Sequence, residues 1–230
     1  MIYKPTPYVD HNFETFQFKH QDQTSEALLT TANKPNAIIY FGGNAENIIY
    51  TVPDLEHHFP NHSSYLLKYR GYAGAAGNPT EDDLYLDALA LYDQVKLKHS
   101  QITVIGKSLG SGVATYVASE RHVDQLVLVT PFDSIRAVAT DLFPFLPIQW
   151  LIKDHHDSKS RVAKIKAPIL VIIADQDRVV PMARTESLLE STPKSKLKIV
   201  TLNAGHNDLD LVPNYFSSIQ EFLNSSSQKN

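Results

Sequence analysis

A glycine-flanked serine that directly follows an apolar strand limits the folds open to this chain. Residues 102–105 are all β-branched, Gly106 ends the run, and Ser108 lies inside a Gly-x-Ser-x-Gly pattern that Gly110 completes. Small residues continue at helical spacing, so the pattern predicts a strand, a sharp turn and a helix. A Cβ atom on either glycine would collide with the neighbouring strand or helix. We therefore expect an exposed Ser108 hydroxyl beside the first N–H groups of a helix.

The composition indicates a single domain with one sizeable core. The chain has 230 residues, of which 43% are hydrophobic, so residues 1–230 are predicted to form one domain with a surface arm over residues 1–12 and a disordered tail over residues 225–230. The net charge of -4 and the lack of a basic run argue against a nucleic-acid partner. The first eight residues contain no apolar core of signal-peptide length, and no later run approaches the length of a membrane span. We therefore expect a cytoplasmic protein without stable membrane insertion. The absence of cysteine excludes disulfides and a cysteine nucleophile.

Strand-like and helix-like segments alternate along the chain. Residues 13–18 and 26–31 are typical of an antiparallel edge hairpin. A continuous apolar run at residues 37–41 predicts a strand that is covered on both faces. Further strands are predicted at residues 64–69, 102–105, 125–130, 169–174 and 197–202. Such alternation predicts the α/β fold class, a mostly parallel central sheet with helices on both faces and a functional site at the carboxyl ends of the strands.

Two loops can supply the groups that Ser108 needs. A serine hydroxyl is a poor nucleophile at neutral pH, and it requires a base within hydrogen-bond reach and an acid that orients the base. His206 follows the last predicted strand, and Asp175 and Asp177 follow the strand before it. Asp175 directly continues its strand and could instead tie down the loop, whereas Asp177 lies further out. Asp133, after an earlier strand, is a weaker candidate for the acid.

A tetrahedral intermediate also needs two preorganised donors for its oxygen. The N–H of Leu109 is the first, because Leu109 follows the serine at the start of the helix. The second should come from the loop of Gly42, Gly43 and Asn44, with the Asn44 N–H preferred and Gly43 next. The alternative is that the glycine pair only makes a turn.

Four other histidines lie in polar or charged surroundings, namely His57, His58, His155 and His156. None has a complete set of partners at ligand spacing, so we interpret them as solvated surface residues and expect no metal site and no cofactor.

Several motifs in order resemble a serine hydrolase of the αβ-hydrolase superfamily, in the cap-poor branch that includes protein depalmitoylases and related serine hydrolases. The resemblance covers most of residues 37–223. Its motifs are Phe-Gly-Gly-Asn-Ala at residues 41–45, Tyr-Arg-Gly-Tyr-Ala at residues 69–73, the serine turn, an Asp177 four residues before a proline, and a glycine before His206. It implies an αβ-hydrolase fold with a minimal cap, Asp177 as the acid of a catalytic triad, and the amides of Asn44 and Leu109 as the oxyanion hole.

The chain departs from that branch at two positions. Gly42 stands where the branch usually has histidine, which could loosen the oxyanion loop, and Ala73 replaces a glycine. The amino-terminal membrane helix of the branch is not matched, so membrane tethering is not transferred.

The predicted reaction is hydrolysis of a carboxylic ester or thioester through an acyl-Ser108 intermediate. We expect Gly43, Phe132 and Phe145 to contact a substrate that is a small molecule or an acylated protein. Residues 139–150 are apolar and could line an acyl-binding groove, or they could be a helix end packed on the core. A peptidase or amidase with the same triad and a non-catalytic ligand-binding member of the fold stay open as alternatives, and so does the oligomeric state.

Overall fold

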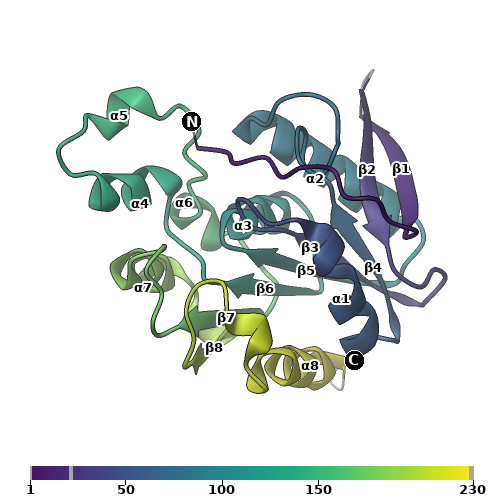
Figure 1. The fold of residues 1–230 in the computed structure, drawn as a ribbon. Coiled ribbons are helices and arrows are strands. Elements are labelled where there is room, and N and C mark those ends of the chain that lie inside the picture. The colour runs from purple at the N-terminus through teal and green to yellow at the C-terminus, as the bar shows by residue number, and fades with distance from the viewer. Residues whose placement is uncertain (1, 21–22, 228–230) are drawn as a thin grey trace.

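A central sheet forms the middle layer of the molecule (Figure 1). The computed structural model describes residues 2–20 and 23–227, and this part of the chain forms one eight-stranded sheet in the order β1-β2-β4-β3-β5-β6-β7-β8. The strands are β1 (Glu14–His20), β2 (Gln23–Leu29), β3 (Asn36–Phe41), β4 (His62–Leu67), β5 (Gln101–Lys107), β6 (Gln125–Val129), β7 (Ile169–Ala174) and β8 (Leu197–Leu202).

The pairing of the strands confirms the predicted fold class. β1 pairs antiparallel with β2, and β2 pairs antiparallel with β4, so the predicted hairpin lies at one edge. All pairs from β4 through β3, β5, β6 and β7 to β8 are parallel. The carboxyl ends of these six strands therefore meet at one rim, as a doubly wound sheet requires.

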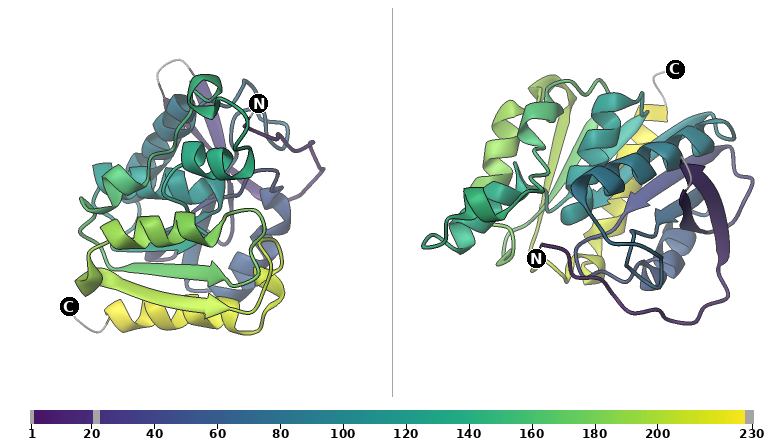
Figure 2. Two further views of the ribbon diagram at one scale, coloured as in Figure 1. Left: turned by 90° about the vertical axis from the view of Figure 1, so that its left-hand side faces the viewer. Right: turned by 90° about the horizontal axis from the view of Figure 1, so that it is seen from above.

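Helices cover both faces of the sheet (Figure 2). They are η1 (Ile48–Tyr50), α1 (Val52–His58), α2 (Glu81–Lys96), α3 (Leu109–Glu120), α4 (Ile135–Leu142), α5 (Ile148–Leu151), α6 (Lys159–Val162), α7 (Met182–Ser191), η2 (Lys194–Lys196), η3 (Leu209–Leu211) and α8 (Asn214–Ser227). Within the described ranges, no helix combines the length and the hydropathy that crossing a bilayer would take.

The alternation of side chains along each buried strand creates two cores. In β3, Ile39 and Phe41 pack in the core shared with α2, α3, α6 and α7, whereas Ile38 and Tyr40 pack in the core shared with α1 and α8. Because both faces are covered, β3, β5, β6 and β7 are apolar at most positions, whereas the edge strand β8 is partly exposed and includes polar residues. This explains why the sequence reveals the four covered strands as largely apolar runs.

Near both ends of the chain, the structure differs from the predicted surface arm and disordered tail. Residues 2–13 have no regular secondary structure, but Tyr3 is buried. At the other end, α8 continues to Ser227, so the tail predicted from residue 225 is wrong for residues 225–227, and residues 228–230 lie outside the described part. The apolar face of α8 packs on the sheet through Phe216, Ile219 and Phe222, which stabilises the helix beyond its own propensity.

The two glycines of the serine turn allow a backbone contact that no side chain would permit. A Cβ atom on Gly110 would lie 1.9 Å from the carbonyl oxygen of Phe41 at the end of β3. A Cβ atom on Gly106 would lie 2.3 Å from the carbonyl oxygen of Gly110. Helix α3 can therefore begin directly against β3 and β5.

We predict that Gly110→Ala lowers the free energy of unfolding by at least about 3 kcal/mol, because backbone atoms must move to admit the methyl group. Gly205→Ala is the matched control. Its Cβ atom would meet only the carboxylate end of Asp208, at 2.7 Å, and a flexible side chain can move, so the loss should stay below about 1 kcal/mol. Urea denaturation of both variants measures the difference, and equal losses would contradict the proposed contact.

Candidate active site

Ser108 lies at the tip of the turn between β5 and α3 in a strained conformation. Its φ of 51° and ψ of -117° are unusual for a residue with a side chain. Two backbone hydrogen bonds of Ser108 stabilise this conformation. The Ser108 N–H donates to the Val129 carbonyl on β6 at 2.9 Å, and the Ser108 carbonyl accepts from the N–H of Ser111 at 2.8 Å. The hydroxyl is thus carried at the carboxyl rim of the sheet by a fixed backbone.

The structure brings Ser108, His206 and Asp177 into one hydrogen-bonded line. His206 Nε2 lies 2.9 Å from the Ser108 hydroxyl oxygen, and His206 Nδ1 lies 2.6 Å from a carboxylate oxygen of Asp177. The side chains of His206 and Asp177 are each only 8% exposed. When Nδ1–H donates to the carboxylate, Nε2 is left free to accept the serine proton.

Asp177 is the carboxylate that meets the histidine. It also accepts from the N–H groups of Val179 and Val180, at 2.8 Å each. Burial raises the pKa of Asp177, but the hydrogen bond from His206 and those two amides outweigh it, so the pKa lies below its ordinary value. The group is therefore ionised at neutral pH and able to stabilise a positive charge on His206.

The other two candidate acids have structural partners instead. Asp175 accepts from the Ala204 N–H at 3.2 Å, which ties the loop after β7 to the loop after β8. Asp133 is buried and pairs with Arg184 at 3.2 Å.

The loop of Gly42, Gly43 and Asn44 presents the Asn44 amide, rather than the Gly43 amide, beside Ser108. The Gly43 N–H donates to the carboxylate of Glu46 at 2.6 Å, and a Cβ atom on Gly43 would lie 3.5 Å from that of Ser108. Gly43 therefore lies beside the serine, and its amide is already engaged. The N–H groups of Asn44 and Leu109 meet no acceptor among residues 2–20 and 23–227, and both residues line the same pocket as Ser108.

Gly42 does not leave this loop loose, contrary to the expectation from its missing histidine. The Gly42 carbonyl accepts from the Tyr69 hydroxyl at 3.0 Å. The side chain of Asn44 donates to the Ile2 carbonyl at 2.8 Å and accepts from the Lys4 N–H at 2.8 Å and the Tyr72 hydroxyl at 2.7 Å. The arm at residues 2–4 therefore fixes the loop, a role that no local pattern in the sequence indicates.

A mostly apolar pocket of about 800 Å³ opens beside Ser108. Phe132 lines it, as predicted. The rest of the wall comes from the arm, from α4, α5 and the residues that join them, and from the loop after β7, with Tyr3, Val138, Ala139, Leu142, Phe143, Leu146, Ile148, Leu151, Val179 and Val180 among the lining residues. Part of the segment at residues 139–150 therefore lines a pocket, while its role in acyl binding stays a prediction.

Phe145 requires a correction, because it is 98% exposed and does not belong to the pocket wall. It lies in the connection between α4 and α5, where Phe143 and Leu146 face the pocket in its place.

The sequence of the chain matches the profile of one protein family. The profile of the dienelactone hydrolase family matches residues 74–206, a range that contains Ser108, Asp177 and His206. The chain belongs to the dienelactone hydrolase family. The resemblance to the αβ-hydrolase superfamily inferred from the motifs is thereby confirmed.

Relatives of this dienelactone hydrolase family member support the same placement. An uncharacterized protein of Mycobacterium tuberculosis is 36% identical over 167 residues, which cover 70% of this chain and 59% of that protein. The αβ-hydrolase domain-containing protein aho-3 of Caenorhabditis elegans is 31% identical over 159 residues, which cover 67% of this chain and 47% of that protein. The alignments thus span less than two thirds of either relative.

Solved structures share the fold. An esterase of Pyrococcus furiosus superposes with a TM-score of 0.80 over 96% of this chain and 99% of the esterase, at 19% sequence identity. At that identity the likeness establishes the fold.

The family member also contains a buried histidine that the sequence places wrongly at the surface. His156 has no exposed area. Its Nε2 shares a hydrogen bond of 3.1 Å with the Tyr3 hydroxyl, and its ring meets the ring of Tyr85 edge-on. Burial lowers the pKa of His156 to about 4, although the nearby Glu81 and Asp154 raise it. Long-range packing of the arm and α2 causes the burial, and no metal-binding cluster of acidic, histidine or cysteine side chains occurs among the described residues.

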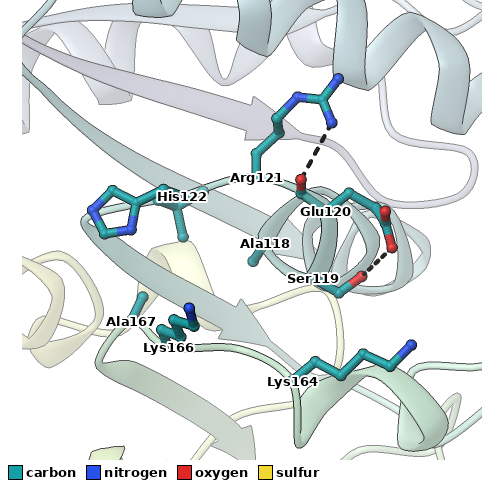
Figure 3. Close-up of a pocket in the computed structure, with 9 residues that line it drawn as sticks. Ala118, Ser119, Glu120, Arg121, His122, Lys164, Lys166 and Ala167 are labelled. Carbon is teal, nitrogen blue, oxygen red and sulfur yellow. Dashed lines mark hydrogen bonds between the residues drawn. The ribbon is translucent and has the colours of Figure 1, made fainter.

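A second cleft of about 220 Å³ lies near the C-terminal end of α3 and the segment after α6 (Figure 3). Its walls include Lys164, Lys166 and His122. Ser119 is also there, but its hydroxyl donates to the Tyr116 carbonyl at 2.8 Å. Among the described residues, no hydrogen bond joins Ser119 to His122 in this cleft, in contrast to Ser108 and His206 at the other site.

We predict that stability falls by up to about 3 kcal/mol between about pH 6.5 and pH 4 because of His156, since the unfolded chain takes up a proton there and the buried ring does not. His156→Asn removes the titrating group and suits the positive φ of 43° at this position. The fall over that pH range should therefore be smaller in the variant.

Urea denaturation at pH 7, 5 and 4 measures these pH slopes. The comparison uses only the change in the free energy of unfolding with pH, so the absolute value for the variant does not enter it. Parallel curves for the two proteins would contradict a neutral buried His156.

Proposed function

We propose that this family member is a serine hydrolase that cleaves a carboxylic ester or thioester through an acyl-Ser108 intermediate. The observation that carries the proposal is the line of Ser108, His206 and Asp177 at hydrogen-bond distances of 2.9 and 2.6 Å, beside a pocket with free amides. This set supplies a nucleophile, a base, an orienting carboxylate and oxyanion donors, which is what acyl transfer requires.

In the first half-reaction the Ser108 oxygen attacks the substrate carbonyl carbon as His206 Nε2 takes the hydroxyl proton. The carbonyl oxygen becomes negative and accepts hydrogen bonds from the Asn44 and Leu109 amides, each worth a few kcal/mol of barrier. Asp177 stabilises the imidazolium. The intermediate then expels an alcohol or thiol, which receives the proton from His206, and acyl-Ser108 is left.

In the second half-reaction a water molecule gives a proton to His206 Nε2 and attacks the acyl carbon. The second tetrahedral intermediate uses the same two amides. Its collapse returns the proton from His206 to the Ser108 oxygen and releases the carboxylic acid.

The pocket favours an apolar acyl group. Its wall is formed mainly by side chains such as Val138, Leu142 and Phe132, and apolar contact area of this kind stabilises a bound hydrocarbon chain. A small acyl ester or thioester and an acylated protein both fit this description.

The predicted cytoplasmic location is untested and stays a prediction of the sequence.

We predict that a fluorophosphonate probe labels the native protein and that Ser108→Ala abolishes the labelling. The same variant should lower kcat/KM for a short acyl ester by about a thousandfold or more, because the nucleophile is lost. Ser119→Ala is the control and should keep both properties, since Ser119 lies in the distant second cleft.

Assays with matched ester, thioester and aminoacyl amide substrates separate the alternatives. Faster turnover of the amide would favour the peptidase reading. Absence of labelling and turnover in the native protein would favour a ligand-binding protein.

We predict that Ala139→Phe shifts the acyl-length preference toward short chains. Ala139 lines the pocket, so a phenyl ring there should lower kcat/KM for an octanoyl ester by about tenfold or more while acetyl ester turnover changes little. Thr140→Phe is the control on the same helix, because Thr140 is exposed and lies outside the pocket wall. Equal effects on both ester lengths would contradict an acyl site here.

A further inference from the structure

The connection between α4 and α5 carries a dense cluster of exposed apolar side chains. We call residues 142–151 the apolar tip. Of the thirteen large hydrophobic side chains that are exposed in the described part of the chain, six belong to these ten residues, namely Leu142, Phe143, Phe145, Leu146, Trp150 and Leu151. The sequence from Leu142 to Ile152 contains no charged residue. Single exposed apolar residues are ordinary, but a contiguous group of this kind marks an interaction surface.

The substrate pocket explains only part of the apolar tip. Phe143, Leu146 and Leu151 belong to the pocket wall, so a bound acyl chain would cover them. Phe145 and Trp150 do not belong to it, and they are 98% and 82% exposed. An occupant other than the substrate must therefore account for these two aromatic side chains.

We propose that the apolar tip docks reversibly on a lipid surface. The tip and its two short helices project from the body of the molecule (Figures 1 and 2), so the aromatic side chains can enter a bilayer interface without rearrangement of the sheet. Phenylalanine and tryptophan are the residues that monotopic proteins place at this depth. Such docking needs no membrane-spanning segment.

The charges around the apolar tip suit lipid headgroups. Lys4 and Lys153 are exposed and lie on the wall of the same pocket. The neighbouring carboxylate of Asp141 is paired with Arg184 at 3.0 Å, and Asp154 is only partly exposed. Within residues 2–20 and 23–227, neither lysine forms an ion pair. An apolar projection flanked by such exposed cations fits an interface that contains anionic lipid.

A second copy of this chain fits the surface less well. Protein interfaces have a polar rim around their apolar centre, and the apolar tip has an uncharged sequence throughout. Packing of the apolar tips of two copies against each other would also cover residues that line the pocket beside Ser108 in each copy. On a lipid surface, by contrast, an acyl chain can pass from the bilayer into the pocket beside Ser108. That route rests on the proposed function, whereas the docking itself does not.

Trp150 provides a direct measurement, because it is the single tryptophan of the chain. The test uses the full chain with Ser108→Ala, so that no lipid is hydrolysed. Vesicles of phosphatidylcholine, with and without phosphatidylglycerol, should shift its fluorescence to shorter wavelengths, and lipids with brominated acyl chains should quench it. Binding should be tighter to the anionic vesicles.

A second substitution, Phe145→Ser, should lower the vesicle affinity by about tenfold or more, because an apolar side chain no longer enters the lipid. Leu97→Ser is the matched control, since Leu97 is an isolated exposed residue at the end of α2 that is 80% exposed. It should leave vesicle binding unchanged.

Three results would overturn the proposal. The first is an unchanged Trp150 spectrum with both kinds of vesicle. The second is an equal loss of affinity in Phe145→Ser and Leu97→Ser. The third is a lipid-independent dimer in sedimentation analysis that Phe145→Ser dissociates, which would assign the tip to a second copy. Because the test uses a protein without the serine nucleophile, its outcome is independent of whether the native protein hydrolyses esters.

Discussion

The contact between Gly110 and the end of β3 is the constraint on which the site depends. The first turn of α3 approaches the Phe41 carbonyl so closely that a Cβ atom has no room. The contact also brings α3 against the loop that begins at Gly42, because a Cβ atom on Gly110 would lie 2.7 Å from the Gly42 carbonyl oxygen. One backbone approach therefore sets the serine, the helix end and the oxyanion loop relative to one another, and the strained φ of Ser108 is maintained by the surrounding packing.

The histidine and its carboxylate reach the serine as a connected unit. Their loops follow β7 and β8, which lie two and three strands away from β5. Adjacent strands are about 4.8 Å apart, so His206 must extend back across the rim. The Asp175 N–H donates to the Leu202 carbonyl at 3.0 Å, and the Gln176 N–H donates to the Ala204 carbonyl at 3.1 Å. These bonds join the two loops that carry Asp177 and His206.

The apolar pocket is assembled from segments that are far apart in the sequence. Its wall combines the arm at residues 2–4 with α4, α5 and the loop after β7. The same arm holds Asn44 through hydrogen bonds at both ends of its side-chain amide. The apolar pocket and the loop that carries Asn44 are thus supported by the same arm. On the outer side of the pocket, Phe145 in the α4–α5 connection and Trp150 in α5 are exposed. Packing of the hydrophobic core does not account for these two apolar side chains.

The sequence by itself determined the features that rest on local physical rules. The apolar runs identified the central parallel strands, because strands covered on both faces consist mostly of apolar residues. The glycines around Ser108 indicated the turn, because only residues without a Cβ atom permit such close packing. The positions of Asp177 and His206 after late strands limited the candidates to one rim of the sheet, although the choice of Asp177 over Asp175 rested on the family resemblance.

The tertiary structure alone decided the rest, because those features depend on contacts between distant residues. The Tyr3 hydroxyl meets His156 across 153 positions, and this contact converts a polar-looking histidine into a buried one. Asp175 and Asp177 differ by two positions in a loop, and only the folded loops assign one to Ala204 and the other to His206. Phe143 and Phe145 are the same residue type and lie two positions apart, yet Phe143 lines the pocket and Phe145 faces solvent. No periodicity separates them, because the connection between α4 and α5 is neither a helix nor a strand.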